Sequence, residues 1–181
     1  MQILFFLITH DFYIYWFHRY QHKSKIFWRT HEAHHSNTNI DWLAGSRSHI
    51  LEILINQTVE FLPIILLGAA PEVAILKGTI DAVWGMYIHS NLNIHTGKLQ
   101  RILNGPEMHR WHHSTGKGRN RNFATKLAIW DWFFGTAFLP ETKPDEYGLK
   151  TFFPNHYFMQ TLFAFRTFKR SPRITTTESE A

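Results

Sequence analysis

The chain contains no cysteine among its 181 residues, and this absence excludes several classes of protein at once. Disulfide-stabilised folds, thiolate zinc sites, iron–sulfur clusters and thiolate-ligated haem all need cysteine. A transition metal in this protein must therefore be bound by nitrogen and oxygen. A nucleotide-binding loop is missing as well, because no Gly-Lys-Ser/Thr element accompanies Gly116 and Gly118. Electrons for any redox reaction must then come from another molecule.

Charged residues make up only 18% of the chain, and their balance is +5. A positive net charge is compatible with binding to nucleic acid, to a membrane surface or to an acidic protein, so the charge alone does not identify the partner. We predict no nucleic-acid partner. Residues 1–17 are apolar but lack the charged start and the small-residue cleavage site of a signal peptide. We expect this segment to be the end of a longer membrane helix.

The sequence is unusually rich in histidine, with thirteen residues, and many of them are spaced along the chain as metal ligands commonly are. Asp11, Tyr15, His18 and His22 fall within roughly 60° of one another on a helix that turns about 100° per residue. They form one polar stripe on an otherwise apolar helix. His10 lies about 80° from His18, so we exclude it from the predicted site.

Two three-histidine boxes extend this pattern. The first places His31, His34 and His35 at positions i, i+3 and i+4, so we expect them on one face of a second helix, aimed with His18 and His22 at a common point. The second box repeats the spacing with His109, His112 and His113. Nine candidates, counting His89, exceed the three or four ligands of one zinc ion. The spacing therefore predicts a site for two metal ions.

A helical hairpin is predicted between the boxes. Residues 50–70 are apolar and long enough to cross the ~30 Å hydrocarbon layer, Gly68 to Pro71 break the helix, and residues 72–89 run back. The out-and-back path brings His89 to the side of the first box. Lysine and arginine near the boxes place that side at the cytoplasmic surface. A start signal at Asn104-Gly105-Pro106-Glu107 predicts a helix that carries the second box.

Three other interpretations compete with these. The histidines could form a solvated face, although the duplicated box argues against it. His31-Glu32-x-x-His35 matches the zincin pattern, in which Glu32 would be the general base of a membrane zinc metallopeptidase, but the second box has Arg110 in the equivalent place. The chain could also be a non-catalytic metal-binding membrane protein. Asp11 is expected to orient an imidazole in the polar stripe, with a salt bridge as the alternative.

The ordered motifs resemble the fatty acid hydroxylase/sterol desaturase superfamily of membrane di-iron oxygenases. The similar segments are Asp11-Phe-Tyr-x-Tyr-Trp-Phe-His18-Arg-x-x-His22, His31-x-x-His34-His35-Ser, Arg47-x-His49-x-x-Glu52, His89-Ser-Asn91, Pro106-x-x-His109-Arg-x-His112-His113 and Trp130-Asp-x-x-Phe134-Gly-Thr136. The resemblance implies that two irons are bound by His18, His22, His31, His34, His35, His89, His109, His112 and His113. His49 is a second-tier candidate, and His95 falls where the pattern requires no histidine.

The resemblance also implies the chemistry. O2 is activated with electrons from an external cytochrome b5- or ferredoxin-like protein, and a lipid C–H bond (sterol, fatty acyl or related isoprenoid) is hydroxylated or desaturated in lipid biosynthesis. Basic residues at Lys117, Arg119 and Arg121 are candidates for docking an acidic electron donor.

The sequence thus predicts an all-α integral membrane helical bundle with a histidine-rich di-metal site at the cytoplasmic face. Residues 1–170 are expected to form one membrane-embedded fatty acid hydroxylase-like domain. The polar residues 171–181 are expected to be a disordered tail.

Overall fold

The computed structural model describes residues 1–167, and the predicted tail at 171–181 lies outside them. Helices and loops make up this part of the chain, with one isolated bridge between Ser114 and Tyr147. The α-helices are α1 (Gln2–Lys23), α2 (Lys25–His31), α3 (Ile50–Leu66), α4 (Pro71–His89), α5 (Pro106–His112), α6 (Ile129–Phe133) and α7 (Tyr157–Phe163). Short 3₁₀ turns occupy His34–Ser36, Ala44–Ser46 and Gly97–Arg101. The predicted all-α class is confirmed.

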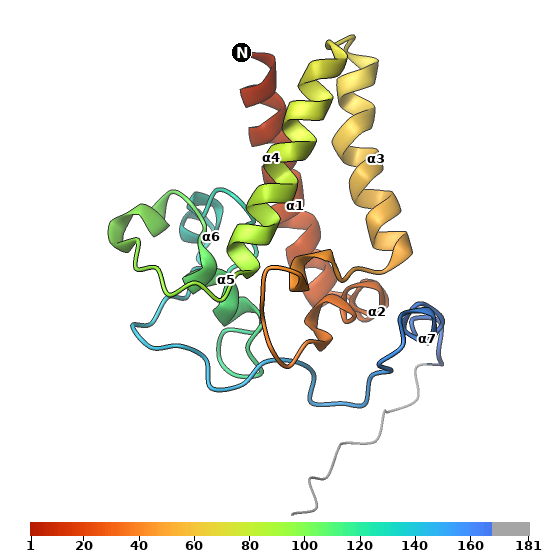
Figure 1. The fold of residues 1–181 in the computed structure, drawn as a ribbon, viewed down its shortest axis with the longest axis vertical. Helices are drawn as coiled ribbons and strands as arrows, with labels where there is room; N and C mark the ends of the chain where they lie inside the picture. Colours follow the sequence, from red (N-terminus) through yellow and green to blue (C-terminus); the bar gives the residue numbers. More distant parts are fainter. Residues whose placement is uncertain (168–181) are drawn as a thin grey trace, which may run out of the picture.

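Three long helices stand side by side in the upper half of the molecule (Figure 1). α1 runs down, α3 runs up from the level of α2, and α4 returns beside both. The turn between α3 and α4 uses Gly68 at φ +65°, a backbone conformation that costs glycine nothing, and Pro71 occupies the first turn of α4. The predicted hairpin is confirmed, and it brings His89 down to the level of α2 and α5.

The lower half consists of short helices and loops fastened by two buried carboxylates. Asp131 accepts hydrogen bonds from the backbone N–H groups of Phe123 and Ala124 at 2.8 and 2.9 Å. Asp11 of α1 accepts from the backbone N–H groups of Lys126 and Leu127 at 2.9 Å each. The irregular loop at 122–127 is therefore held between α1 and α6. Its backbone N–H groups are not paired within a helix or a strand, and the two carboxylates accept their hydrogen bonds instead.

The aromatic segment at 130–136 packs on α1, as the sequence indicates. Tyr15, Phe123 and Ala124 are buried together, with Trp130 and Phe134 against them. The ring centroids of Tyr15 and Phe134 lie 5.2 Å apart, and the Tyr15 hydroxyl shares a 2.9 Å hydrogen bond with Thr136. This cluster fixes the lower half against the middle of α1.

Many large apolar side chains of the three long helices face outward. They include Leu4, Phe5 and Trp16 of α1, Leu54, Ile65 and Leu66 of α3, and Ile75, Leu76 and Val83 of α4. No helix within residues 1–167 has both the length and the apolarity to cross a membrane. The membrane-embedded part of the predicted fold therefore stays a prediction.

Candidate metal centre

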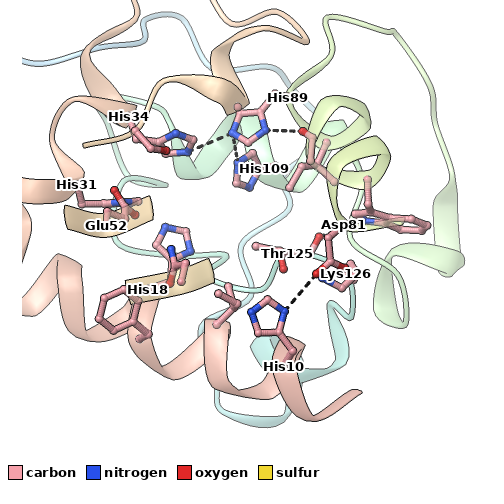
Figure 2. A pocket seen from close by; sticks show the side chains of 18 of the residues that line it. His10, His18, His31, His34, Glu52, Asp81, His89, His109, Thr125 and Lys126 are labelled. Atoms are coloured by element: carbon pink, nitrogen blue, oxygen red, sulfur yellow. Dashed lines mark hydrogen bonds and ion pairs between the residues drawn. The ribbon is translucent and has the colours of Figure 1, made fainter. Parts of the chain in front are cut away.

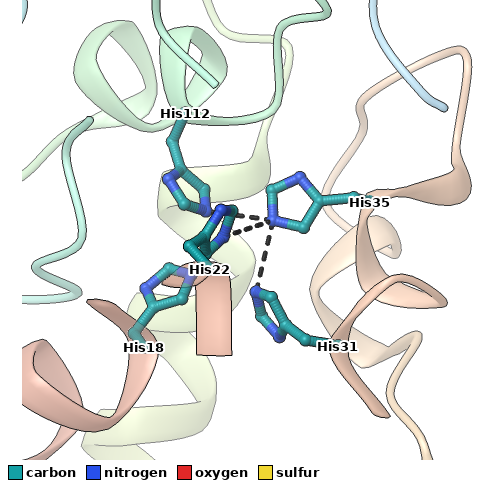
Figure 3. A group of neighbouring side chains, drawn as sticks. All are labelled: His18, His22, His31, His35 and His112. Carbon is teal, nitrogen blue, oxygen red and sulfur yellow. Dashed lines mark hydrogen bonds between the residues drawn. The ribbon is translucent and has the colours of Figure 1, made fainter. Parts of the chain in front are cut away.

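The structure gathers five of the predicted ligands into a first histidine group, consisting of His18, His22, His31, His35 and His112 (Figure 3). His18 and His22 come from α1, His31 ends α2, His35 follows in the 3₁₀ turn and His112 ends α5. The Nε2 atom of His35 lies 3.1 Å from Nε2 of His22, 3.2 Å from that of His31 and 3.1 Å from that of His112. His35 is therefore the centre of this group.

The remaining four predicted ligands form a second histidine group, consisting of His34, His89, His109 and His113. The Nε2 atom of His89 lies 3.1 Å from Nε2 of His34, 2.8 Å from that of His109 and 3.2 Å from that of His113. The two groups are adjacent, since the rings of His35 and His113 stack with centroids 4.5 Å apart. All nine candidates are thus brought together, in two neighbouring sets.

In several rings the opposite nitrogen, Nδ1, donates to a backbone carbonyl. His18 Nδ1 donates to the Phe123 carbonyl at 2.8 Å and His112 Nδ1 donates to the Arg121 carbonyl at 2.7 Å. His89 Nδ1 donates to the Gly85 carbonyl one turn earlier in α4, at 2.7 Å. A carbonyl oxygen can only accept, so each of these rings carries its proton on Nδ1.

This proton assignment leaves lone pairs on the converging Nε2 atoms. Lone pairs that face one another at about 3 Å repel unless a cation lies between them. Two ligands at about 2.1 Å from one metal ion, at angles of 90 to 109°, are themselves roughly 3.0 to 3.4 Å apart. The Nε2 separations measured from His35 and from His89 fall in or close to this interval, and all ligand atoms of each group lie within 4.8 Å of one another. The nine residues therefore fit two metal ions.

Burial favours the neutral form of several of these imidazoles, which is the form that binds metal. Burial lowers the pKa of His112 and of His113 well below the usual range, and the neighbouring imidazoles lower it further. The same two causes lower the pKa of His34 and of His35. The groups are therefore ready to bind metal at neutral pH without first releasing protons.

The first box does not lie on one helix face, which corrects a prediction. α2 ends at His31, and the chain turns into a 3₁₀ segment at His34–Ser36. His31 and His35 enter the first histidine group, whereas His34 enters the second. The second box, carried by α5, is divided in the same way, since His109 and His113 enter the second group and His112 enters the first. In both boxes the middle histidine therefore joins the other group.

The predicted role of Asp11 in orienting an imidazole is wrong, whereas the alternative, a salt bridge, is present with Lys126 at 3.6 Å. Its carboxylate contacts no histidine and instead accepts from Thr125, Trp130 and two backbone N–H groups. The carboxylate that does hold an imidazole is Glu52 of α3, whose Oε1 lies 2.7 Å from His31 Nδ1 and also accepts from Gln21. The motif Arg47-x-His49-x-x-Glu52 pointed to this residue, but only the return of α3 beside α1 shows its partner.

The other candidates lie apart from the two groups. Glu32 is paired with Arg166, which leaves it unsuited to the zincin role. His49 caps α3 by accepting from the Leu51 N–H at 3.1 Å, and His95 is exposed and pairs with Glu107. His10 belongs to a separate polar cluster with Glu60 and Asp81.

Gly45 is a residue that sequence reasoning missed. A Cβ atom at this position would lie 2.8 Å from Nδ1 of His89. Only glycine therefore lets the loop before α3 approach the central imidazole of the second histidine group this closely.

A cavity of about 230 Å³ opens beside both groups (Figure 2). His18, His31, His34, His89 and His109 line one end of it. Apolar walls come from Ile14 and Phe17 of α1 and from Trp84 and Ile88 of α4. The candidate metal centre thus faces a pocket between the three long helices.

Comparison with known proteins agrees with this site. The family model for fatty acid hydroxylases matches residues 3–136, a stretch that contains every member of both histidine groups. The chain belongs to the fatty acid hydroxylase family, as predicted.

Individual relatives point the same way. The chain is 34% identical over 140 residues to an ornithine lipid hydroxylase of Rhizobium tropici, covering 77% of this chain and 42% of the relative. It is 35% identical over 144 residues to human alkylglycerol monooxygenase, covering 77% and 31%, and 29% identical over 146 residues to methylsterol monooxygenase 1-3 of Arabidopsis thaliana, covering 75% and 47%. The alignments thus span less than half of each of these relatives. Their names agree with the predicted oxidoreductase class. No solved structure matches the chain.

Proposed function

We propose that the chain is the catalytic domain of a non-haem di-iron oxygenase that hydroxylates or desaturates a C–H bond of a lipid, such as a sterol, a fatty acyl chain or a related isoprenoid. The observation that carries the proposal is the pair of adjacent histidine groups at one end of an internal cavity. Imidazole nitrogen binds iron, zinc, copper or nickel. Iron is favoured because the relatives are named hydroxylases and monooxygenases, and zinc has no redox chemistry.

Two bound irons would supply the reduction of O2 and the removal of hydrogen from an unactivated C–H bond. The chain's own contribution is to bring nine imidazoles together in two groups. Four of the rings are oriented with Nε2 inward by Nδ1 contacts to Phe123, Arg121, Gly85 and Glu52. The apolar walls of the cavity exclude water and place one carbon of the lipid near the metal centre. The aromatic side chain of Trp84 is part of that wall.

A membrane is the proposed location, with the histidine groups at the cytoplasmic side. The support is the outward-facing apolar surface of α1, α3 and α4, because soluble monomers rarely expose so many large apolar side chains in one region. Lys23, Lys25 and Arg29 follow the lower end of α1, next to the histidine groups, and positive residues there are typical of the cytoplasmic interface.

Metal analysis tests the proposal directly. Protein purified in detergent from iron-57-grown cells is examined by elemental analysis and Mössbauer spectroscopy, and O2 consumption is followed with reductant and lipid. We expect two irons per chain as a coupled pair and lipid-dependent O2 uptake. One zinc with no iron would favour a metallopeptidase instead, and bound metal without O2 uptake would favour a non-catalytic metal-binding protein.

Glu52 provides a first prediction about this site. Replacing it by glutamine (Glu52→Gln) keeps the size of the side chain but removes the negative charge that faces His31. Changes to groups that orient metal ligands typically cost 10- to 100-fold in metal affinity or activity, and we expect a loss of about that size. The measurement is iron retention against a chelator. Glu32→Gln is the matched control and should retain iron like the wild type, since Glu32 contacts Arg166 and not a ligand.

The electron donor is proposed to dock beside the first histidine group. Lys117 and Arg121 are exposed there, and the guanidinium of Arg119 lies 5.0 Å above the ring of Trp28. Trp28 in turn contacts His35, with ring centroids 5.3 Å apart. These contacts form a short path from a basic surface to the metal centre.

Charge reversal tests this surface. The double change Lys117→Glu and Arg121→Glu should slow turnover with an acidic ferredoxin- or cytochrome b5-type donor about tenfold or more at low salt, because positive charge attracts the donor. Turnover with a small chemical reductant should stay unchanged. The same reversal at the exposed Lys143 and Lys150 is the control. Equal rates for the two double variants with the protein donor would contradict the docking proposal.

A further inference from the structure

A second cluster of polar residues lies inside the helical bundle, away from the metal centre. Lys77 of α4 is fully buried, and its Nζ atom lies 3.0 Å from Glu60 Oε1, 2.8 Å from Asp81 Oδ2 and 3.0 Å from His10 Nδ1. The ammonium group stands where a metal ion bound by His10, Glu60 and Asp81 would stand. The ammonium group of Lys77 therefore takes the place of a metal ion in this cluster, and we assign no metal to it.

The ammonium group fixes the proton of His10. Lys77 has three N–H donors and no acceptor, and its three neighbours use all three donors. Nδ1 of His10 also lies 3.2 Å from Asp81 Oδ2, but its contact with Lys77 is shorter and Lys77 can only donate. We therefore assign Nδ1 as the acceptor and place the ring proton on Nε2. That Nε2 atom is buried, His10 lines the cavity, and no described residue accepts its hydrogen bond. A buried donor without an acceptor is costly, so this N–H calls for an oxygen atom inside the cavity.

The charges around the cavity select a neutral oxygen. Lys126 pairs with Asp81 at 2.9 Å and with Asp11 at 3.6 Å, so the charges of Lys77 and Lys126 are both already neutralised. The carboxylates of Glu60, Asp81 and Asp11 thus outnumber the ammonium groups of the two lysines by three to two. A carboxylate or phosphate would add to an existing excess of negative charge, and a cation would face the N–H of His10. A neutral group that accepts a hydrogen bond fits both conditions.

The acceptors of the cavity narrow the choice to a hydroxyl. Glu52 Oε2 and Asn56 Oδ1 are buried, line the same cavity and have no hydrogen-bond partner among the described residues. Asn56 is one turn of α3 from Glu60 and so lies nearer to His10 than Glu52 does. A hydroxyl can accept from His10 Nε2 and donate to Asn56 Oδ1, whereas an ether or ester oxygen can only accept.

Helix geometry gives the distance between this cluster and the metal centre. His10 precedes His18 by eight residues in α1, Glu60 follows Glu52 by eight in α3, and Asp81 precedes His89 by eight in α4. Eight residues of helix span about 12 Å. Three helices thus carry the same two layers, and Figure 2 shows His10 across the cavity from His89 and His109.

We propose that the cavity binds a lipid with a neutral hydroxyl group, which is held by His10 at the end remote from the histidine groups. The hydroxyl is then about 12 Å from the metal centre, so the carbon presented for oxidation is several bonds away from it. This proposal deepens the proposed function and rests on it for the lipid nature of the ligand.

Two substitutions of His10 separate hydroxyl binding from structural support. In His10→Asn the amide oxygen can replace Nδ1 as the acceptor for Lys77, but no donor reaches the place of Nε2. In His10→Gln the longer side chain puts an amide N–H near that place. His156→Asn, at an exposed histidine, is the matched control.

Binding is measured on the full chain in detergent by quenching of tryptophan fluorescence, since Trp84 lines the cavity. The probes are a bromine-labelled long-chain saturated alcohol and the bromine-labelled hydrocarbon of the same length. We expect the preference of the wild type for the alcohol over the hydrocarbon to fall about tenfold in His10→Asn. His10→Gln and His156→Asn should keep most of it. Taking the ratio between variants cancels the different partition of the probes into micelles.

The outcomes separate this proposal from the proposed function, because iron is counted in the same samples. An unchanged preference in His10→Asn with two irons bound overturns the hydroxyl site and leaves the oxygenase standing. Iron-free protein whose preference depends on His10 supports the hydroxyl site and argues against the oxygenase. If the wild type shows no preference, the N–H of His10 faces only water and the proposal is wrong.

Discussion

His35→Ala and His89→Ala should each reduce bound iron from two per chain toward one, and should lower O2-dependent turnover of lipid by a factor of 100 or more. Each residue is the centre of its histidine group, with Nε2 within 3.2 Å of three other Nε2 atoms. Removing the central imidazole leaves the others too far apart or too few to hold the ion. Iron per chain and O2 uptake are the measurements.

The two single variants also test the division into groups. The double variant should bind no iron, and each single variant should retain the ion of the other group with altered Mössbauer parameters, because His35 and His113 stack between the groups. His95→Ala, at an exposed histidine outside both groups, should behave as wild type. Two irons retained in His35→Ala would show that the first histidine group is not a metal site.

Asp11→Asn should destabilise the protein by about 2 to 4 kcal/mol, a large part of the stability of a domain of this size. Each carboxylate oxygen of Asp11 accepts two hydrogen bonds, from Thr125 and Lys126 on one side and from Leu127 and Trp130 on the other. An asparagine must turn its NH2 group toward one of these pairs of donors. The two donors of that pair then lose their acceptor. The NH2 group of the asparagine, itself a donor, lies directly against them.

The consequence should extend to the metal centre, because the same loop supplies the Phe123 carbonyl that holds His18. Unfolding by denaturant in detergent and iron retention measure both effects. Asp145→Asn, at an exposed aspartate, should change the unfolding free energy by less than about 0.5 kcal/mol. Equal stability of the two variants would contradict the anchoring role given to Asp11.

The candidate ligands could be predicted from the sequence because helix spacing is a local property. His18 and His22 are separated by one turn wherever that helix lies, and the second box sits on α5, which begins at the predicted Pro106. The hairpin was equally local, because Gly68 and Pro71 interrupt the helix in any surroundings. Nine candidate residues and the return of His89 therefore followed from spacing and turn chemistry alone.

Which candidate histidines lie in the same group was decided only by the tertiary structure. In each box the first and last histidines enter one group and the middle one enters the other, because α1 completes the first group and His89 of α4 completes the second. The partners of the carboxylates were also beyond the sequence. Glu52 holds His31 and Asp11 holds a loop more than a hundred residues away, because hydrogen-bond partners depend on how α1, α3 and the loop at 122–127 pack together.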